Sequence, residues 1–99
     1  QKASINSYPY IYADLLMQTA FAECIYGYYD DAMHHLDEAD AIYLNYGDAL
    51  SHANVVFTKG TVKAESSQYQ DAVDLFIQAK QVFDEYLPPT DLSHAVVLN

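Results

Sequence analysis

Basic residues are scarce in this sequence, which contains four lysines and no arginine against fourteen acidic residues and has a formal net charge of −10. Neutralising the phosphates of a nucleic acid requires a cluster of lysine or arginine side chains. The excess of negative charge also disfavours adsorption to anionic membranes, and no apolar run approaches the roughly 18 residues that cross a bilayer. We therefore expect neither a nucleic-acid partner nor a membrane partner.

Cysteine is nearly absent as well: Cys24 stands alone, so no internal disulfide can staple the fold. This favours a reducing compartment and predicts a cytoplasmic location. The N-terminus does not lead into a signal-peptide core. Because the chain also lacks an initiator methionine, we expect it to be a piece of a longer protein.

The length and apolar content predict one small globular domain, with 99 residues, 52% hydrophobic and 18% charged. A chain of this size buries only about 60 to 65% of its unfolded surface. A deep active site around a large cofactor is therefore not expected, and we assign no cofactor.

An internal repeat is the strongest pattern in the sequence. A shift of 40 residues superposes small residues on small ones, apolar residues on their like and acids on acids. The matched pairs are Ala13 and Ala53, Leu16 and Val56, Ala20 and Gly60, Tyr29 and Tyr69, Asp31 and Asp71, Ala32 and Ala72, Leu36 and Phe76, Ala39 and Ala79, Ile42 and Val82, Tyr43 and Phe83, and Tyr46 and Tyr86. A shift of 42 lays residues 92–95 on the identical residues 50–53. This predicts units at 9–47 and 48–88 and a third that begins at 90–99.

Each unit is predicted to contain two helices. Ala32, Leu36, Ala39 and Tyr43 are spaced i, i+4, i+7 and i+11, which draws one apolar stripe along an α-helix, and the second unit repeats it. Turns are expected at Gly27, at Gly47-Asp48 and at Ser66-Ser67, with Ser67 and Gln70 forming a capping box for the helix that follows. No sustained alternation of apolar and polar residues suggests a strand.

These residues resemble the tetratricopeptide repeat (TPR) family over about residues 10–99. The family's small residue midway along the first helix corresponds to Ala20 and Gly60, and the alanines of its second helix correspond to Ala32, Ala39, Ala72 and Ala79. The spacing of 40 to 42 exceeds the usual 34 or so, so the resemblance is to long-repeat members. It implies an all-α, TPR-like solenoid of antiparallel helical hairpins, with two full units and the first helix of a third.

The resemblance also implies a concave surface, formed by the first helices, on which an extended or helical peptide lies. Carrying the groove positions across gives Asp14, Met17, Phe21, Cys24 and Ile25 in the first unit and Asn54, Phe57, Thr61, Ala64 and Glu65 in the second. The set is apolar with acidic edges and lacks the basic residues of the family's carboxylate clamp. We expect a hydrophobic segment with basic residues at its edges to fit it; the open alternative is that the apolar members pack against a neighbouring helix or subunit.

His34 and His35 lie among acids and are candidate ligands of a metal ion. Adjacent histidines point about 100° apart on a helix and cannot share one ion without a distant ligand. A solvated acidic face is the preferred interpretation, and no metal or catalytic residue is assigned. His52 and His94 occupy equivalent repeat positions, which favours packing, and the role of Tyr8, Tyr10 and Tyr12 is left open.

Together these features predict a non-enzymatic protein-interaction or scaffold segment of a larger signalling or regulatory protein. Two and a fraction repeats leave apolar ends uncovered, so we also expect self-association, as a homodimer. One alternative is a homodimerisation module that binds no peptide. An alternative of another class is a metal- or cysteine-dependent enzyme centred on Cys24, His34 and His35.

Overall fold

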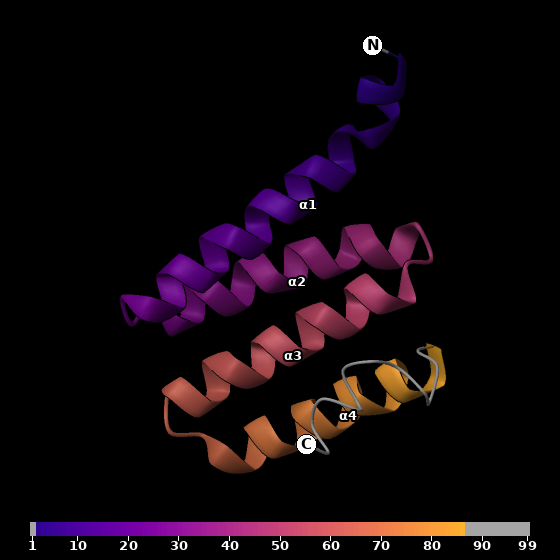
Figure 1. The fold of residues 1–99 in the computed structure, drawn as a ribbon. Helices are drawn as coiled ribbons and strands as arrows, with labels where there is room; N and C mark the ends of the chain where they lie inside the picture. The colour runs from indigo at the N-terminus through magenta and orange to yellow at the C-terminus, as the bar shows by residue number, and fades with distance from the viewer. Residues whose placement is uncertain (1, 87–99) are drawn as a thin grey trace, which may run out of the picture.

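The fold is an array of antiparallel α-helices. The computed structural model describes the backbone of residues 2–86 and the side chains of residues 8–86. Within residues 2–86 it contains four helices and no strand: α1 (Lys2–Ile25), α2 (Tyr29–Asn45), α3 (Ala49–Glu65) and α4 (Tyr69–Tyr86). Each helix packs on the next, giving the hairpins α1–α2 and α3–α4 (Figure 1). The predicted all-α array of helical hairpins is confirmed; the third unit at 90–99 lies outside the described residues.

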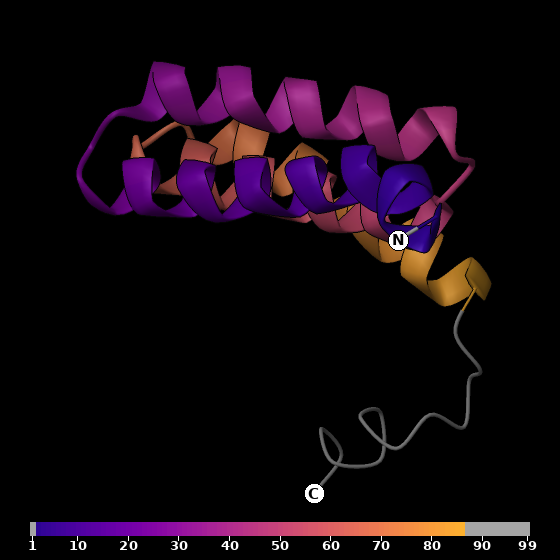
Figure 2. The same cartoon turned by 90° about the horizontal axis from the view of Figure 1, so that it is seen from above.

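The helices do not lie in one plane. Seen from above, α2 stands apart from α1 and α3, which overlap one another (Figure 2). In agreement with this view, α1 packs chiefly on α2 but also touches α3. The first helices of the two hairpins therefore share one face of the molecule. No helix within residues 2–86 is long and apolar enough to cross a membrane.

Three turns of the same kind connect the helices. In the first, Gly27 N–H donates to the carbonyl of Cys24 and Tyr28 N–H to that of Glu23, the two bonds of a Schellman motif. The same pair of bonds recurs around Gly47 and around Ser67. The last residue of each motif also accepts the first bond of the next helix, and these three residues, Tyr28, Asp48 and Gln68, are spaced evenly along the chain.

The third turn corrects the expected capping box. Ser67 does not cap α4; it ends α3 in a left-handed conformation, with φ of 67°, where the other two turns place Gly27 and Gly47. Helix α4 instead starts from Gln68, whose carbonyl accepts the N–H of Ala72. The sequence signal failed because serine is common both at helix N-caps and in turns.

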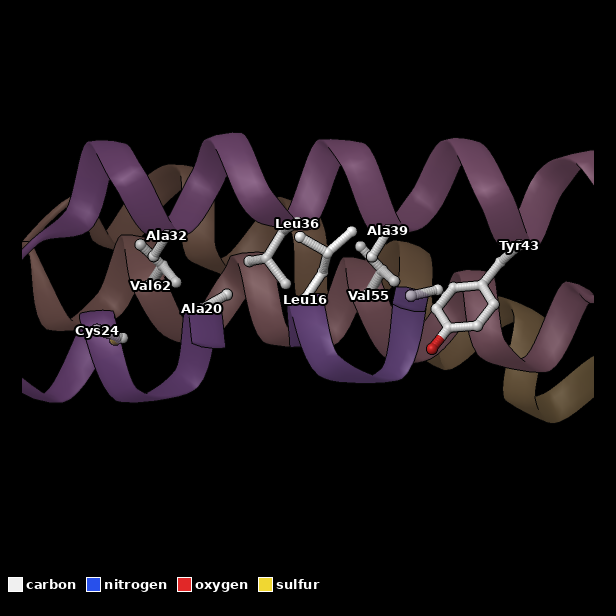
Figure 3. Close-up of a cluster of buried hydrophobic side chains, with 10 residues drawn as sticks. Leu16, Ala20, Cys24, Ala32, Leu36, Ala39, Tyr43, Val55 and Val62 are labelled. Carbon is white, nitrogen blue, oxygen red and sulfur yellow. The ribbon is translucent and has the colours of Figure 1, made fainter. Parts of the chain in front are cut away.

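The main core lies where α1, α2 and α3 meet. Leu36 is fully buried at its centre, and the crossing of α1 and α2 is made by the fully buried Ala20, Ala32 and Ala39 (Figure 3). Val55 and Val62 of α3 close the cluster from the other side. Alanine at the crossing lets the two backbones approach closely, and the larger side chains fill the remaining space.

The second hairpin makes the same crossing with different volumes. Gly60 takes the place of Ala20, and Phe76 takes the place of Leu36. A Cβ atom at Gly60 would stand 2.7 Å from Cε1 of Phe76, so the glycine provides the space that the ring occupies. The Phe57 and Phe76 rings lie 5.2 Å apart between centroids, and Ala72 and Ala79 of α4 are buried.

Helix α1 extends beyond the first predicted unit at its N-terminus. It begins at Lys2, whereas the first unit was predicted to begin at residue 9. The predicted boundary fell beside Pro9, but the helix runs through this residue. Tyr8 and Tyr12 are exposed, while Tyr10 turns inward, with its ring centroid 5.3 Å from that of Tyr43. The tyrosine cluster therefore belongs to α1, and one of its three members packs on α2.

Candidate functional site

An open apolar hollow of about 450 Å³ lies between the two first helices of the hairpins. Helix α1 supplies five of its lining residues and α3 supplies one. They are Met17, Gln18, Phe21, Ala22, Ile25 and Thr58. Phe21 and Ile25 are 56% and 68% exposed, so large apolar side chains face solvent here. We call this hollow and the exposed residues beside it on α1 and α3 the α1–α3 groove.

Of the groove residues predicted on α1, Met17, Phe21 and Ile25 line the hollow. Asp14 is exposed but accepts a hydrogen bond from the Tyr43 hydroxyl at 2.5 Å, which ties it to α2. Cys24 is only 5% exposed and belongs to the core between α1 and α2. The structure therefore separates Cys24 from the groove-lining side chains.

The groove residues predicted on α3 follow one side of that helix. Asn54 and Glu65 are exposed, and Thr61 is half-buried with its hydroxyl donating to the carbonyl of Phe57. Phe57 is 48% exposed, yet its ring contacts Phe76 of α4. One side of the Phe57 ring therefore packs against a neighbouring helix, as the alternative interpretation of the apolar residues predicts. None of these four residues lines the hollow itself.

Three lining residues were missed by the sequence analysis: Gln18, Ala22 and Thr58. Helical spacing offered a signal for the first of them, since Gln18 lies one turn from the predicted Asp14 and one turn from Ala22. Gln18 and Thr58 also occupy equivalent positions in the 40-residue repeat. The groove positions implied by the resemblance do not include these three residues.

The charge around the groove is negative. Asp14 and Glu65 are exposed carboxylates on its two helices, and no lysine lies on its lining. The lysines with described side chains are engaged elsewhere: Lys59 with Asp37, Lys80 with Asp84, and Lys63 with the Gln68 side chain. The groove therefore offers apolar contact bordered by negative potential.

Two histidines bond carboxylates on the preceding helix. Nδ1 of His35 on α2 lies 2.7 Å from Oε1 of Glu23 on α1, and Nδ1 of His52 on α3 lies 2.6 Å from Oδ1 of Asp40 on α2. Both pairs are separated by 12 residues and close across a turn. The sequence predicts a solvated acidic face around His35. In the structure His35 also joins α2 to α1, and this contact across the turn could not be read from the sequence.

The Glu23 bond has an electrostatic consequence for His35. The hydrogen bond to Glu23 raises the pKa of this imidazole above its ordinary value, the charges of Glu38 and Asp31 add to the rise, and partial burial opposes it. His34, its neighbour, is exposed. Among the residues whose side chains are described, no group of three or more histidine, cysteine or acidic side chains converges as a metal site would require.

Cys24 is the one thiol of the chain. Burial raises its pKa above the ordinary value, and the nearby negative charge of Glu65 adds to this rise. At neutral pH the thiol therefore stays in its protonated form, which is the weaker nucleophile.

Comparisons with protein-family models, with curated proteins and with solved structures found no match to this chain. The functional interpretation therefore depends on the geometry of the groove and its surroundings.

Proposed function

We propose that this chain is a non-enzymatic, TPR-like interaction segment of a larger signalling or regulatory protein. Its ligand is a peptide or helix of a partner protein, apolar in the centre with basic residues at its edges. This segment lies in the α1–α3 groove. The observation that carries the proposal is the apolar hollow between α1 and α3, in which Phe21 and Ile25 are more than half exposed.

Apolar contact supplies the affinity in this proposal. A side chain such as leucine or phenylalanine that enters the hollow would remove Phe21, Ile25 and Met17 from water, and burial of apolar surface contributes about 25 cal/mol per Å². Open apolar hollows with few polar groups are the usual form of ligand sites on proteins.

Charge supplies the selectivity. The net charge of −10 and the exposed carboxylates of Asp14 and Glu65 attract a basic segment and repel an acidic one. No lysine of the described part of the chain lies free on the groove lining to receive a ligand carboxylate. Lysine or arginine beside the apolar centre of the ligand fits this surface.

The test is a titration with a fluorescently labelled peptide that carries leucine and phenylalanine in its centre and lysine at both ends. We expect saturable binding, and we expect Phe21→Asp to weaken it at least about tenfold. Leu44→Asp is the matched control, because Leu44 is 54% exposed on α2 and lies outside the groove. The same peptide with glutamate in place of lysine should bind more weakly. Equal affinity of the wild type and Phe21→Asp for the lysine peptide would refute the site.

The second candidate, a homodimerisation module without a peptide ligand, is favoured by the exposed apolar side chains on the outer sides of α1 and α4. They are Tyr8, Ile11, Tyr12 and Leu15 on α1 and Val73 and Ile77 on α4. This candidate predicts self-association with no binding of the lysine peptide at any concentration. The titration above therefore separates the two.

A further inference from the structure

The joint between the two hairpins, formed by α2 and α3, shows how this chain packs one unit on the next. Val55 and Val62 of α3 are almost completely buried there, at 0% and 1% exposure. At the edge of the same joint Nζ of Lys59 lies 2.5 Å from Oδ1 of Asp37, and His52 bonds Asp40. The internal joint thus combines an apolar centre with bases on α3 that face acids on α2.

The 40-residue repeat identifies the residues of α1 and α4 that are equivalent to those of this joint. Helix α1 occupies the place of α3, so Leu15 corresponds to the buried Val55, Thr19 to Lys59 and Tyr12 to His52. Leu15 is nevertheless 55% exposed, because nothing in the described chain packs on this side of α1. We call Tyr12, Leu15 and Thr19 the α1 face, at the edge of which the Tyr12 hydroxyl donates to Glu38 of α2.

Helix α4 likewise occupies the place of α2. Val73 corresponds to Met33, Ile77 to Asp37 and Lys80 to Asp40, and we call these three residues of α4 the α4 face. Val73 and Ile77 are about half exposed, and Lys80 pairs with Asp84 on its own helix. The α4 face therefore presents an apolar surface with one cation, where α2 presents two acids.

The residues of the two faces differ from their equivalents in the α2–α3 joint in ways that compensate one another. Ile77 replaces the acid of the Asp37–Lys59 pair, and Thr19 replaces its base, so at this pair of positions neither face leaves a charge without a partner in a joint of this geometry. Burying one such charge alone would be strongly unfavourable. Lys80 replaces the second acid and is paired with Asp84 of its own helix. Its counterpart is Tyr12, whose hydroxyl donates to Glu38 of the same chain and whose ring can receive an ammonium group.

We infer that a second copy of this chain packs its α1 face on the α4 face of the first, in the arrangement that joins α2 to α3. The α1 face carries no charge, which lets two copies with a net charge of −10 approach each other. The two contacting surfaces are different, so the contact is head to tail. Each added copy presents a new α4 face, and the array can extend.

The test measures molar mass by sedimentation equilibrium from micromolar to millimolar concentration. Wild-type protein should exceed the mass of the 11.1 kDa monomer increasingly as concentration rises. Ile77→Asp places an acid on the α4 face and Thr19→Lys places a base on the α1 face, and each alone should weaken association at least about tenfold. Gln78→Asp is the control with the same charge change, because the next residue points about 100° away on the helix.

Mixing supplies the decisive arm. An equimolar mixture of the Ile77→Asp and Thr19→Lys proteins should regain association, because the engineered acid and base recreate the Asp37–Lys59 pair between copies. A two-fold contact of α1 with α1, or of α4 with α4, gives no such recovery, and that result would overturn the inference. So would a monomeric wild type, or an Ile77→Asp protein that loses thermal stability without any change in mass, which would mean that the chain covers its own α4 face. Both substitutions are on exposed positions of separate helices, and circular dichroism confirms that each variant is folded.

Discussion

The two hairpins build the same crossing from different side chains. In α1–α2 an alanine, Ala20, faces the fully buried Leu36 (Figure 3), whereas in α3–α4 a glycine, Gly60, faces the larger and only partly buried ring of Phe76. A smaller residue on one helix thus accompanies a larger residue on the other. What the repeat preserves is a small residue on one helix opposite a larger residue on the other, and the two hairpins divide the volume between them in different ways.

The hairpins differ more sharply in their polar contacts. The first is crossed by hydrogen bonds from Tyr43 to Asp14 and from Tyr12 to Glu38, and by the His35–Glu23 pair. Within residues 8–86, no side-chain hydrogen bond or ion pair joins α3 to α4, and the ring contact of Phe57 with Phe76 takes their place. The first hairpin should therefore respond to pH and the second to changes of side-chain volume.

The largest effect is expected at the aromatic crossing. In a Phe76→Leu background, which copies the first hairpin, Gly60→Ala should raise the free energy of unfolding by about 1 kcal/mol, because alanine has the higher helix propensity. In the wild-type background the new Cβ meets the Phe76 ring at 2.7 Å, and this overlap should oppose the gain by about 1 to 3 kcal/mol. Urea unfolding of the two single variants and the double variant measures this coupling. Simple additivity would show that the ring moves aside without cost.

The Tyr43–Asp14 bond of the first hairpin provides the next test. Tyr43→Phe removes a hydroxyl that donates to a carboxylate at 2.5 Å, so we expect a loss of about 1 to 2 kcal/mol of unfolding free energy. Tyr26→Phe is the control, because Tyr26 is 77% exposed at the end of α1.

The same tyrosine has a pH signature. Burial, the hydrogen bond to Asp14 and its charge raise the pKa of Tyr43 well above its ordinary value. The unfolded chain therefore ionises this phenol first, so its contribution is complete below about pH 10 and declines as the pH rises towards the higher folded value. Wild type should lose more stability than Tyr43→Phe in that alkaline range, and parallel curves would contradict the assignment.

The turn of the second hairpin is expected to be improvable. Ser67 adopts φ of 67°, the conformation that Gly27 provides in the first hairpin. Ser67→Gly should therefore stabilise the protein by about 0.5 to 1 kcal/mol, measured as a higher midpoint of thermal unfolding. Ser66→Gly serves as the control, since Ser66 has φ of −90° and gains nothing from glycine. A lower midpoint for Ser67→Gly would show that the serine side chain has a role of its own.

The smallest effect should come from the His35–Glu23 pair, at or below about 0.5 kcal/mol because the pair is partly exposed. Its hydrogen bond raises the pKa of His35 in the folded state, so folding favours the protonated imidazole. The stabilisation is complete below the unfolded pKa of about 6.5 and is lost as the pH rises through the folded value. His35→Gln should remove this dependence between pH 6 and 8 (about the range of an ordinary imidazole), whereas His34→Gln, at an exposed position, should retain it.

The sequence was sufficient for the helices, because the stripe through Ala32, Leu36, Ala39 and Tyr43 marks the buried face of α2, and its copy 40 residues later marks the partly buried face of α4. Helix ends were harder. The first predicted unit begins at residue 9, but α1 starts at Lys2 and runs through Pro9. The pattern at Ser67 predicts a helix N-cap, but this residue adopts a left-handed conformation after α3. A local sequence pattern cannot decide between two backbone conformations when the same residue type is common in both.

The groove was foreseen in part for a related reason. Helical spacing and the repeat placed Met17, Phe21 and Ile25 correctly on one side of α1. They could not show that Cys24, one turn from Phe21, rotates into the core, or that His35 and His52 meet carboxylates across the turns. Those outcomes depend on the relative rotation of two packed helices, which a spacing within one helix does not specify.

The even placement of the three turns makes the array a modular cassette. Tyr28, Asp48 and Gln68 each precede a helix and follow the same Schellman geometry. The backbone therefore has the same turn geometry before residue 28 as before residue 68. A second copy of residues 28–67 could be spliced in at either junction without designing a linker. Gene duplication or protein engineering could lengthen this array by whole copies of the segment, because the existing turns would serve as the connections.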